Sequence, residues 1–147
     1  MESYQLWIIG KKGWKNESFE KALSSSTNRN SILLKGFVTK EVLLQAYQNC
    51  TAFVYPSLYE GFGFPILEAL ACGTRVITSQ NSSLQEIAGS FATLVIDPLD
   101  PKELAQSIFN SLQQPIPDPD AIQEHLKQFS WDQTAKRFLN IINQDTF

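Results

Sequence analysis

Short apolar segments alternate with amphipathic segments along the whole sequence, and this alternation constrains the fold more than any other feature. The apolar segments are rich in Ile, Leu and Val and lack strict polar alternation, which is typical of strands buried on both faces. They lie at residues 5–9, 31–35, 52–55, 75–78 and 92–96.

The segments between these predicted strands repeat their apolar residues with helical spacing. They lie at residues 17–25, 40–49, 65–71, 84–88 and 101–112. Alternating strands and helices predict an α/β fold, a Rossmann-like parallel sheet of about five strands with helices on both faces.

Two of the predicted helices begin with capping signals. Asp100 precedes a proline and has a glutamate, Glu103, three residues later; Ser83 is followed by Glu86 at the same distance. Both patterns are typical of a capping box. After the last strand–helix unit, we expect a proline-rich loop at 113–119 and C-terminal helices at 120–144, all within one domain of residues 1–147.

Composition excludes several classes of partner. The chain has 147 residues, of which 43% are hydrophobic and 18% charged, with a net charge of −3. Because basic residues form no stripe, nucleic acid is not expected as a partner. No apolar segment approaches the roughly 20 residues that span a bilayer. We therefore expect a cytoplasmic protein, at most peripheral to a membrane.

The sequence offers few cysteine or histidine side chains for a metal or catalytic site. Cys50 and Cys72 lie far apart without a metal-binding spacing, which predicts buried free thiols. His125 is the single histidine, so a zinc site or a serine–histidine–acid triad is not expected.

The most informative segment is the loop between the predicted strand at 52–55 and the predicted helix at 65–71. Gly61 and Gly63 allow the backbone to approach a ligand without a Cβ in the way. The free N–H groups of Phe64 and Ile66 at the helix start favour an anion such as a diphosphate. The loop also follows the carboxyl end of a strand, where ligands of open α/β sheets bind.

Two glutamates, Glu60 and Glu68, flank this predicted anion site with seven residues between them. Carboxylates only accept hydrogen bonds, so they suit sugar hydroxyls and not phosphates. Amide donors in the middle with carboxylates on either side match a nucleotide sugar, in which hydroxyls flank a diphosphate.

The segment from Tyr55 to Gly73 resembles the C-terminal, nucleotide-sugar-binding domain of retaining glycosyltransferases of family 4, which have the two-domain GT-B fold. The hallmark of that family is a pair of glutamates with seven residues between them, within a Pro-Ser-x-x-Glu-Gly-Phe-Gly sequence. Matching segments elsewhere extend the resemblance over nearly the whole chain; they are Gly36-Phe37-Val38-Thr39, Cys72-Gly73-Thr74, Ser83-Leu84-Gln85-Glu86 and Asp97-Pro98.

The resemblance implies a role for each matched position. Glu60 is the catalytic-site residue, near the reacting centre of the donor sugar, and Glu68 binds the ribose hydroxyls. Val38 contacts the base through its backbone. The donor sugar and the diphosphate are held by the amides of Gly61, Phe62, Gly63 and Phe64. The implied reaction transfers a hexose from a UDP-, GDP- or ADP-sugar to a glycan or other acceptor, with retention and without a metal or other cofactor.

The resemblance also implies parts that this chain lacks. Family members carry an upstream strand ending in Gly-Arg, then a lysine, and an N-terminal acceptor domain. Lys11, Lys12 and Lys15 lie in a different loop from those cations. We therefore expect a fragment that is inactive alone. Its sheet should close by pairing residues 5–9 with residues 52–55. Its exposed sheet edges should allow weak homo-oligomers.

Two other functions remain open. One is a non-catalytic nucleotide-sugar-binding or assembly module from a split or truncated glycosyltransferase. The other, an epimerase of nucleotide sugars, is disfavoured because the chain offers few acid–base groups beyond the two glutamates. Asp118 and Asp120 form an Asp-x-Asp sequence, but no predicted strand precedes them, which favours helix capping over metal binding.

Overall fold

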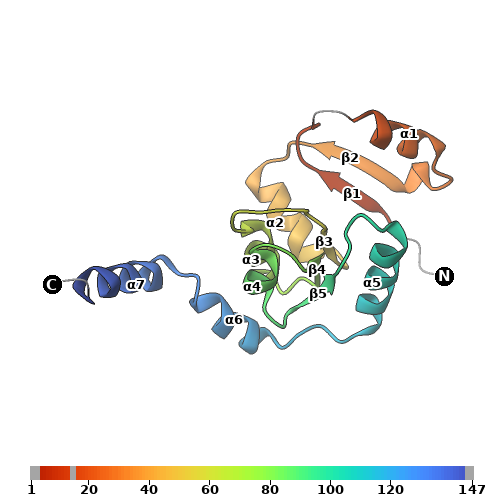
Figure 1. Ribbon diagram of the computed structural model, residues 1–147. Coiled ribbons are helices and arrows are strands. Elements are labelled where there is room, and N and C mark those ends of the chain that lie inside the picture. The colour runs from red at the N-terminus through yellow and green to blue at the C-terminus, as the bar shows by residue number, and fades with distance from the viewer. Residues whose placement is uncertain (1–3, 14–15, 145–147) are drawn as a thin grey trace. The chain divides into compact units, whose positions relative to one another are not determined.

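The computed structural model describes residues 4–13 and 16–144. The chain divides into two compact units, Met1–Leu44 and Gln45–Phe147, and each is described here by itself. Figure 1 labels the helices and strands of both units.

The first unit contains a two-stranded parallel sheet. Strand β1 (Leu6–Ile9) pairs with β2 (Ile32–Gly36), and the connection between them holds α1 (Glu17–Ser25) and a short 3₁₀ helix, η1 (Arg29–Ser31). Helix α2 (Lys40–Asn49) then leads into the second unit. The bounds of α1 and α2 are those predicted from the apolar spacing.

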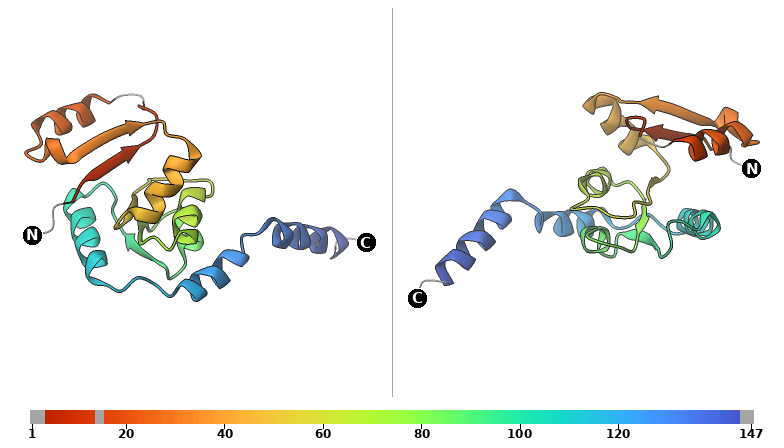
Figure 2. Two further views of the ribbon diagram at one scale, coloured as in Figure 1. Left: turned by 180° about the vertical axis from the view of Figure 1, so that it is seen from behind. Right: turned by 45° about the horizontal axis from the view of Figure 1, so that its top comes forward.

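The second unit contains a three-stranded parallel sheet with the order β3-β4-β5. Successive strands are joined by α3 and α4, and α5 follows the last strand. Figure 2 shows α5 on the opposite side of this sheet from α3 and α4. The bounds are β3 (Phe53–Tyr55), α3 (Phe64–Ala71), β4 (Val76–Ser79), α4 (Leu84–Ala88), β5 (Ala92–Val95) and α5 (Pro101–Gln113).

The core of the second unit surrounds the central strand. All four residues of β4 are buried, the apolar Val76 and Ile77 as well as the polar Thr78 and Ser79. Side chains from α3 and α4 complete the core, and the largest of them are Ile66, Leu70, Leu84 and Ile87. The carboxyl ends of β3 and β4 are thereby fixed on a rigid base.

Two helices follow α5 in the described residues, as predicted: α6 (Pro119–Lys127) and α7 (Trp131–Gln144). Helix α6 packs against α3 and buries Ile122. The Nε2 atom of His125 lies 2.8 Å from the carbonyl oxygen of Ile87. A Cβ at Gly89, whose φ is +55°, would come within 2.8 Å of the His125 ring, so this packing requires glycine.

The α/β class and the parallel strands are confirmed, with two strands paired in the first unit and three in the second. The predicted pairing of residues 5–9 with 52–55 concerns strands of different units and stays a prediction. Each strand pairs with its sequence neighbour inside its own compact unit, because a crossover helix brings that neighbour alongside. Cys50 and Cys72 are free thiols as expected, but their predicted burial is wrong, since Cys50 is exposed and Cys72 is only partly buried.

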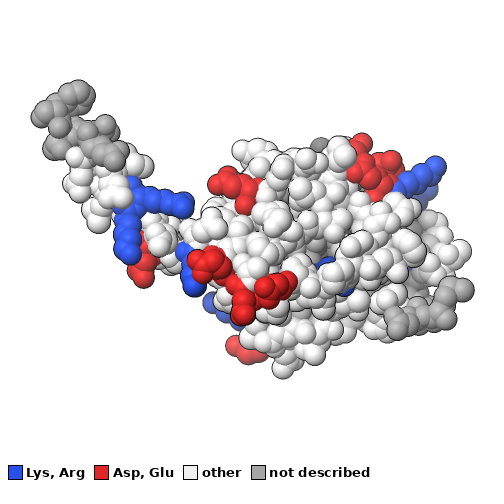
Figure 3. Space-filling view, turned by 90° about the horizontal axis from the view of Figure 1, so that it is seen from below, with Lys and Arg blue, Asp and Glu red and all other residues white. Residues whose placement is uncertain are grey.

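The surface agrees with the charge balance of the sequence. On the face drawn in Figure 3, basic and acidic side chains alternate in small groups without a continuous basic area. Among the helices of the described ranges, none combines the length and the apolar character that crossing a membrane requires.

Candidate functional site

The loop between β3 and α3 is shaped by a glycine at its end. Gly63 caps α3 with a φ of +121°, a conformation that side-chain-bearing residues rarely adopt. A Cβ at this position would lie 3.0 Å from Cδ2 of Leu84 and 3.7 Å from Cδ1 of Ile66. The loop therefore passes close over the core at this point, and only glycine fits there.

Glu60 is held by two hydroxyl groups. The Tyr55 hydroxyl donates a hydrogen bond of 2.6 Å to Oε1 of Glu60, and the Ser57 hydroxyl donates one of 2.9 Å to the same oxygen. The other oxygen, Oε2, has no hydrogen-bond donor within the described part of the chain. The half-buried carboxylate thus keeps one oxygen free for a ligand.

A pair of serines at the start of α4 holds the backbone of the same loop. The Ser83 hydroxyl donates to the carbonyl oxygens of both Glu60 and Phe62. The Glu60 amide in turn donates to the Ser82 hydroxyl, over 3.2 Å. The capping box predicted for Ser83 is therefore wrong, because its hydroxyl bonds the glutamate loop and makes no side-chain cap.

Backbone donors remain available between the two glutamates. The amides of Gly61, Phe62, Gly63 and Phe64 have no hydrogen-bond acceptor among the residues that the structure describes. Because α3 begins at Phe64 without a side-chain cap, the Phe64 N–H can bind an anion together with the loop amides before it. The predicted contribution of Ile66 is wrong, since its amide donates to the Gly63 carbonyl oxygen over 3.0 Å.

The two phenylalanines of the loop are partly exposed. Phe62 and Phe64 are 38% and 57% accessible, and their ring centroids lie 4.7 Å apart. Phe62 also contacts Phe129, with 6.2 Å between ring centroids. These contacts shape the loop from outside the core, while the amides carry the predicted binding role.

Glu68 lies one turn inside α3 and is exposed. Its Oε2 atom accepts a hydrogen bond of 3.3 Å from the Tyr47 hydroxyl. Burial, together with the charge of Glu68, raises the pKa of Tyr47 well above its ordinary value of 10. The phenol is therefore a permanent donor at neutral pH.

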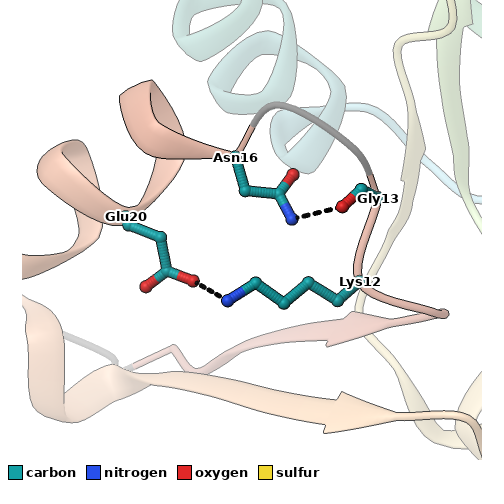
Figure 4. Close-up of polar contacts among 4 residues, drawn as sticks. All are labelled: Lys12, Gly13, Asn16 and Glu20. Atoms are coloured by element: carbon teal, nitrogen blue, oxygen red, sulfur yellow. Dashed lines mark hydrogen bonds and ion pairs between the residues drawn. The ribbon is translucent and has the colours of Figure 1, made fainter.

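The remaining predicted residues belong to the first unit. Val38 is half-buried and follows β2, two residues after its end, so its predicted contact with a base stays a prediction. Lys12 forms an ion pair of 2.6 Å with Glu20, beside a hydrogen bond from Asn16 to the Gly13 carbonyl oxygen (Figure 4). Lys11 is exposed, and Lys15 lies outside the described residues.

The Asp-x-Asp sequence serves a helix start. Asp118 is the N-cap of α6, and its carboxylate accepts a hydrogen bond of 3.2 Å from the Asp120 amide, which confirms the predicted capping role. Over the ranges 4–13 and 16–144, no group of three or more His, Cys, Asp or Glu side chains could hold a metal ion.

Sequence reasoning missed the hydroxyl groups that support the site. Tyr47, Tyr55 and Ser57 hold the carboxylates, and the two serines at 82 and 83 hold the loop backbone. The spacing of Ser57, three residues before Glu60, was a usable local signal. The contact from the start of α4 depends on tertiary structure and has no sequence signal of its own.

Parallel strands interleaved with helices thus carry a glycine-shaped loop with free amides and two carboxylates supported by hydroxyl groups. The family model described as "Glycosyl transferases group 1" matches residues 1–137. The chain therefore belongs to the group 1 glycosyltransferases.

Relatives and solved structures agree with this family. The chain is 38% identical over 140 residues to O-antigen chain mannosyltransferase B of Escherichia coli, covering 93% of this chain and 36% of that protein. The serotype-specific mannosyltransferase WbdA of Escherichia coli is 35% identical over 115 residues, which cover 78% of this chain and 13% of that protein. The chain thus spans about a third or less of the curated relatives it matches.

The structural comparison places the fold in the C-terminal portion of GT-B structures. Sucrose-phosphate synthase from Thermosynechococcus elongatus aligns with a TM-score of 0.75 and 27% identity, over 95% of this chain and 38% of that one. The lipopolysaccharide outer core galactosyltransferase WaaB shares the fold, with a TM-score of 0.71 and 23% identity over 95% of this chain and 40% of that one.

Proposed function

We propose that this chain is the donor-binding domain of a retaining hexosyltransferase, which takes its hexose from a nucleoside diphosphate sugar. The family supports a sugar-transfer function and disfavours the epimerase alternative. The mannosyltransferase relatives make GDP-mannose the first donor to test.

The observation that carries this proposal is the order of acceptors and donors along one loop. A carboxylate with a free oxygen at Glu60 comes first, four unpaired amides follow, and the Glu68 carboxylate comes last. A nucleotide sugar presents sugar hydroxyls, a diphosphate and ribose hydroxyls in the matching order. Carboxylates bind diols well and repel phosphates, so the opposite assignment is unfavourable.

In this proposal the site acts by positioning and by electrostatic stabilisation. Glu60 orients the donor sugar near the reacting carbon, and the loop amides stabilise the negative charge that grows on the departing diphosphate. The amides are fixed by the Ser83 contacts before the ligand arrives, so little reorganisation is needed. Glu68 holds the ribose and the backbone near Val38 contacts the base.

We also propose that donor binding needs no metal ion, because the amides supply the donors that a diphosphate requires. A cytoplasmic location and an acceptor-binding domain elsewhere in a complete enzyme remain parts of the same proposal. A non-catalytic nucleotide-sugar-binding module would use the same residues and differs only in lacking transfer.

A thermal-shift panel tests the proposal. UDP, GDP and ADP are compared with their hexose conjugates, each with and without EDTA. Saturation at about 100 times Kd stabilises a protein by roughly 2.7 kcal/mol, so one base should raise Tm by several degrees in both EDTA conditions. If no nucleotide shifts Tm, donor binding is refuted; if EDTA abolishes a shift that manganese or magnesium restores, metal independence is refuted.

A further inference from the structure

Three aromatic side chains of the second unit form a continuous row, Tyr47–Phe53–Tyr55. The ring centroids of Tyr47 and Phe53 lie 5.1 Å apart with the rings nearly perpendicular. Those of Phe53 and Tyr55 lie 5.7 Å apart with the rings close to parallel. The row therefore joins α2 to β3 through direct ring contacts.

Each end of this row carries a hydroxyl group, and each hydroxyl reaches one glutamate of the pair. Tyr55 donates to Oε1 of Glu60 over 2.6 Å, and Tyr47 donates to Oε2 of Glu68 over 3.3 Å. Apart from Ser57, the described residues provide no other side-chain donor to these carboxylates. One rigid row thus contacts both carboxylates of the candidate site.

The backbone of the row is tied to the strand and loop beside it. The Thr74 hydroxyl donates to the Tyr47 carbonyl oxygen over 2.6 Å, and the Thr78 hydroxyl donates to the Tyr55 carbonyl oxygen over 2.8 Å. Thr74 and Thr78 are themselves buried. Because both ties lead to the buried core, the row has little freedom to shift when a ligand binds.

Both phenols stay protonated in the physiological range. Burial, followed by the hydrogen bond and the charge of Glu60, raises the pKa of Tyr55 to about 12. Burial and the charge of Glu68 raise the pKa of Tyr47 in the same direction. Neither hydroxyl can serve as a proton acceptor near neutral pH, which leaves a positioning role.

We propose that the aromatic row sets the positions of the two glutamates, so that Tyr55 orients Glu60 toward the donor sugar and Tyr47 orients Glu68 toward the ribose. Both tyrosines are positioning residues, since each acts through a carboxylate. This inference rests on the proposed nucleotide-sugar binding. It adds that the two ends of the donor are recognised through separate hydroxyls on one shared support.

The test is calorimetric titration of Tyr55→Phe and Tyr47→Phe with GDP and GDP-mannose, or with the pair that the thermal-shift panel selects. Tyr59→Phe is the matched control, because Tyr59 lies in the same loop, is 79% exposed and makes no side-chain hydrogen bond with the described residues. Each Phe variant keeps the ring and removes only the hydroxyl.

The two variants should fail in different ways. Tyr55→Phe should keep its affinity for the free nucleotide and lose about tenfold in affinity for the nucleotide sugar, as expected for a weakened charge-assisted contact. Tyr47→Phe should lose affinity for both ligands by a similar factor, because ribose is common to both. Tyr59→Phe should match the wild-type protein.

The outcomes separate this inference from the proposed function. If the wild-type chain binds neither ligand, the proposed function fails and the inference fails with it. If the wild-type chain binds both ligands but Tyr55→Phe behaves like Tyr59→Phe, the function stands and the inference is wrong. Equal losses of affinity for both ligands in Tyr55→Phe would indicate a purely structural role for Tyr55 and would also contradict the inference. If Tyr47→Phe does not fold, the result for Tyr55, which is more accessible, decides.

Discussion

The two compact units differ in how completely they bury their apolar side chains. Among the described residues of Met1–Leu44, Leu23 is the only hydrophobic side chain in the buried core, and Leu6 and Leu34 are 51% and 48% exposed. In Gln45–Phe147, by contrast, the whole of β4 is buried.

Both supported carboxylates belong to the densely packed unit. Glu60 and Glu68 are held by side chains of Gln45–Phe147, whose hydroxyl ties end on the buried strand β4 and on the loop before it. Val38, by contrast, belongs to the thinly packed unit. A site that must hold its groups before a ligand arrives needs the support that only dense packing gives.

Truncating a core residue in each unit should give the largest difference. Ile77 in β4 is fully buried, so Ile77→Ala should lower the free energy of unfolding by about 2–5 kcal/mol. Leu34→Ala in β2 should cost less than about 1 kcal/mol, because this side chain is half-exposed. Urea denaturation measures the free energy of unfolding of both variants. Equal losses would contradict the difference in packing between the units.

Substituting a glycine that has a positive φ in each unit should show the same contrast, with a smaller loss of stability. Gly63→Ala should cost roughly 1–3 kcal/mol, because it combines a strained φ of +121° with a Cβ 3.0 Å from Leu84. Gly36→Ala in the first unit has a φ of +62° and an empty space around its Cβ, so about 1 kcal/mol is expected. Thermal unfolding compares them; a larger loss at Gly36 would contradict the close packing under the glutamate loop.

Alkaline titration of Tyr55, in the second unit, gives the smallest effect. Because folding raises the pKa of Tyr55 to about 12, its contribution to stability is complete below pH 10 and is lost as the pH rises from 10 to 12. Glu60→Gln should move part of this ionisation to lower pH, since burial remains while the charge is gone. Tyrosinate absorbance follows the change, and an unaltered titration curve in Glu60→Gln would show that the two groups do not interact.

The sequence predicted local structure better than the contacts between elements. The bounds of α1, α2 and α4 follow directly from apolar spacing, and Asp100 caps α5 as expected by accepting from the Lys102 amide. Ser83 shows where this reasoning ends. Its local pattern indicates a cap, yet its hydroxyl bonds the glutamate loop, because that loop lies within reach only after the chain has folded.

The candidate site was predictable to a similar degree. The glutamate spacing and the glycines identified the loop, and the free amides lie where expected, apart from that of Ile66. The supporting tyrosines could not be predicted, because a strand pattern does not tell which hydroxyl will meet a carboxylate in the next loop.

Donor binding between the two glutamates is tested most directly by calorimetric titration of Glu68→Ala and Glu60→Ala with a free nucleoside diphosphate and its hexose conjugate. Glu68→Ala should lose about 1.5–3 kcal/mol of binding free energy for both ligands, because a charged hydrogen-bond acceptor for the ribose hydroxyls is gone. Glu60→Ala should bind the free nucleotide as the wild-type protein does and lose only the added affinity for the sugar. Unchanged affinity in Glu68→Ala, or equal losses for both ligands in Glu60→Ala, would contradict the assignment of these residues to the two ends of the donor.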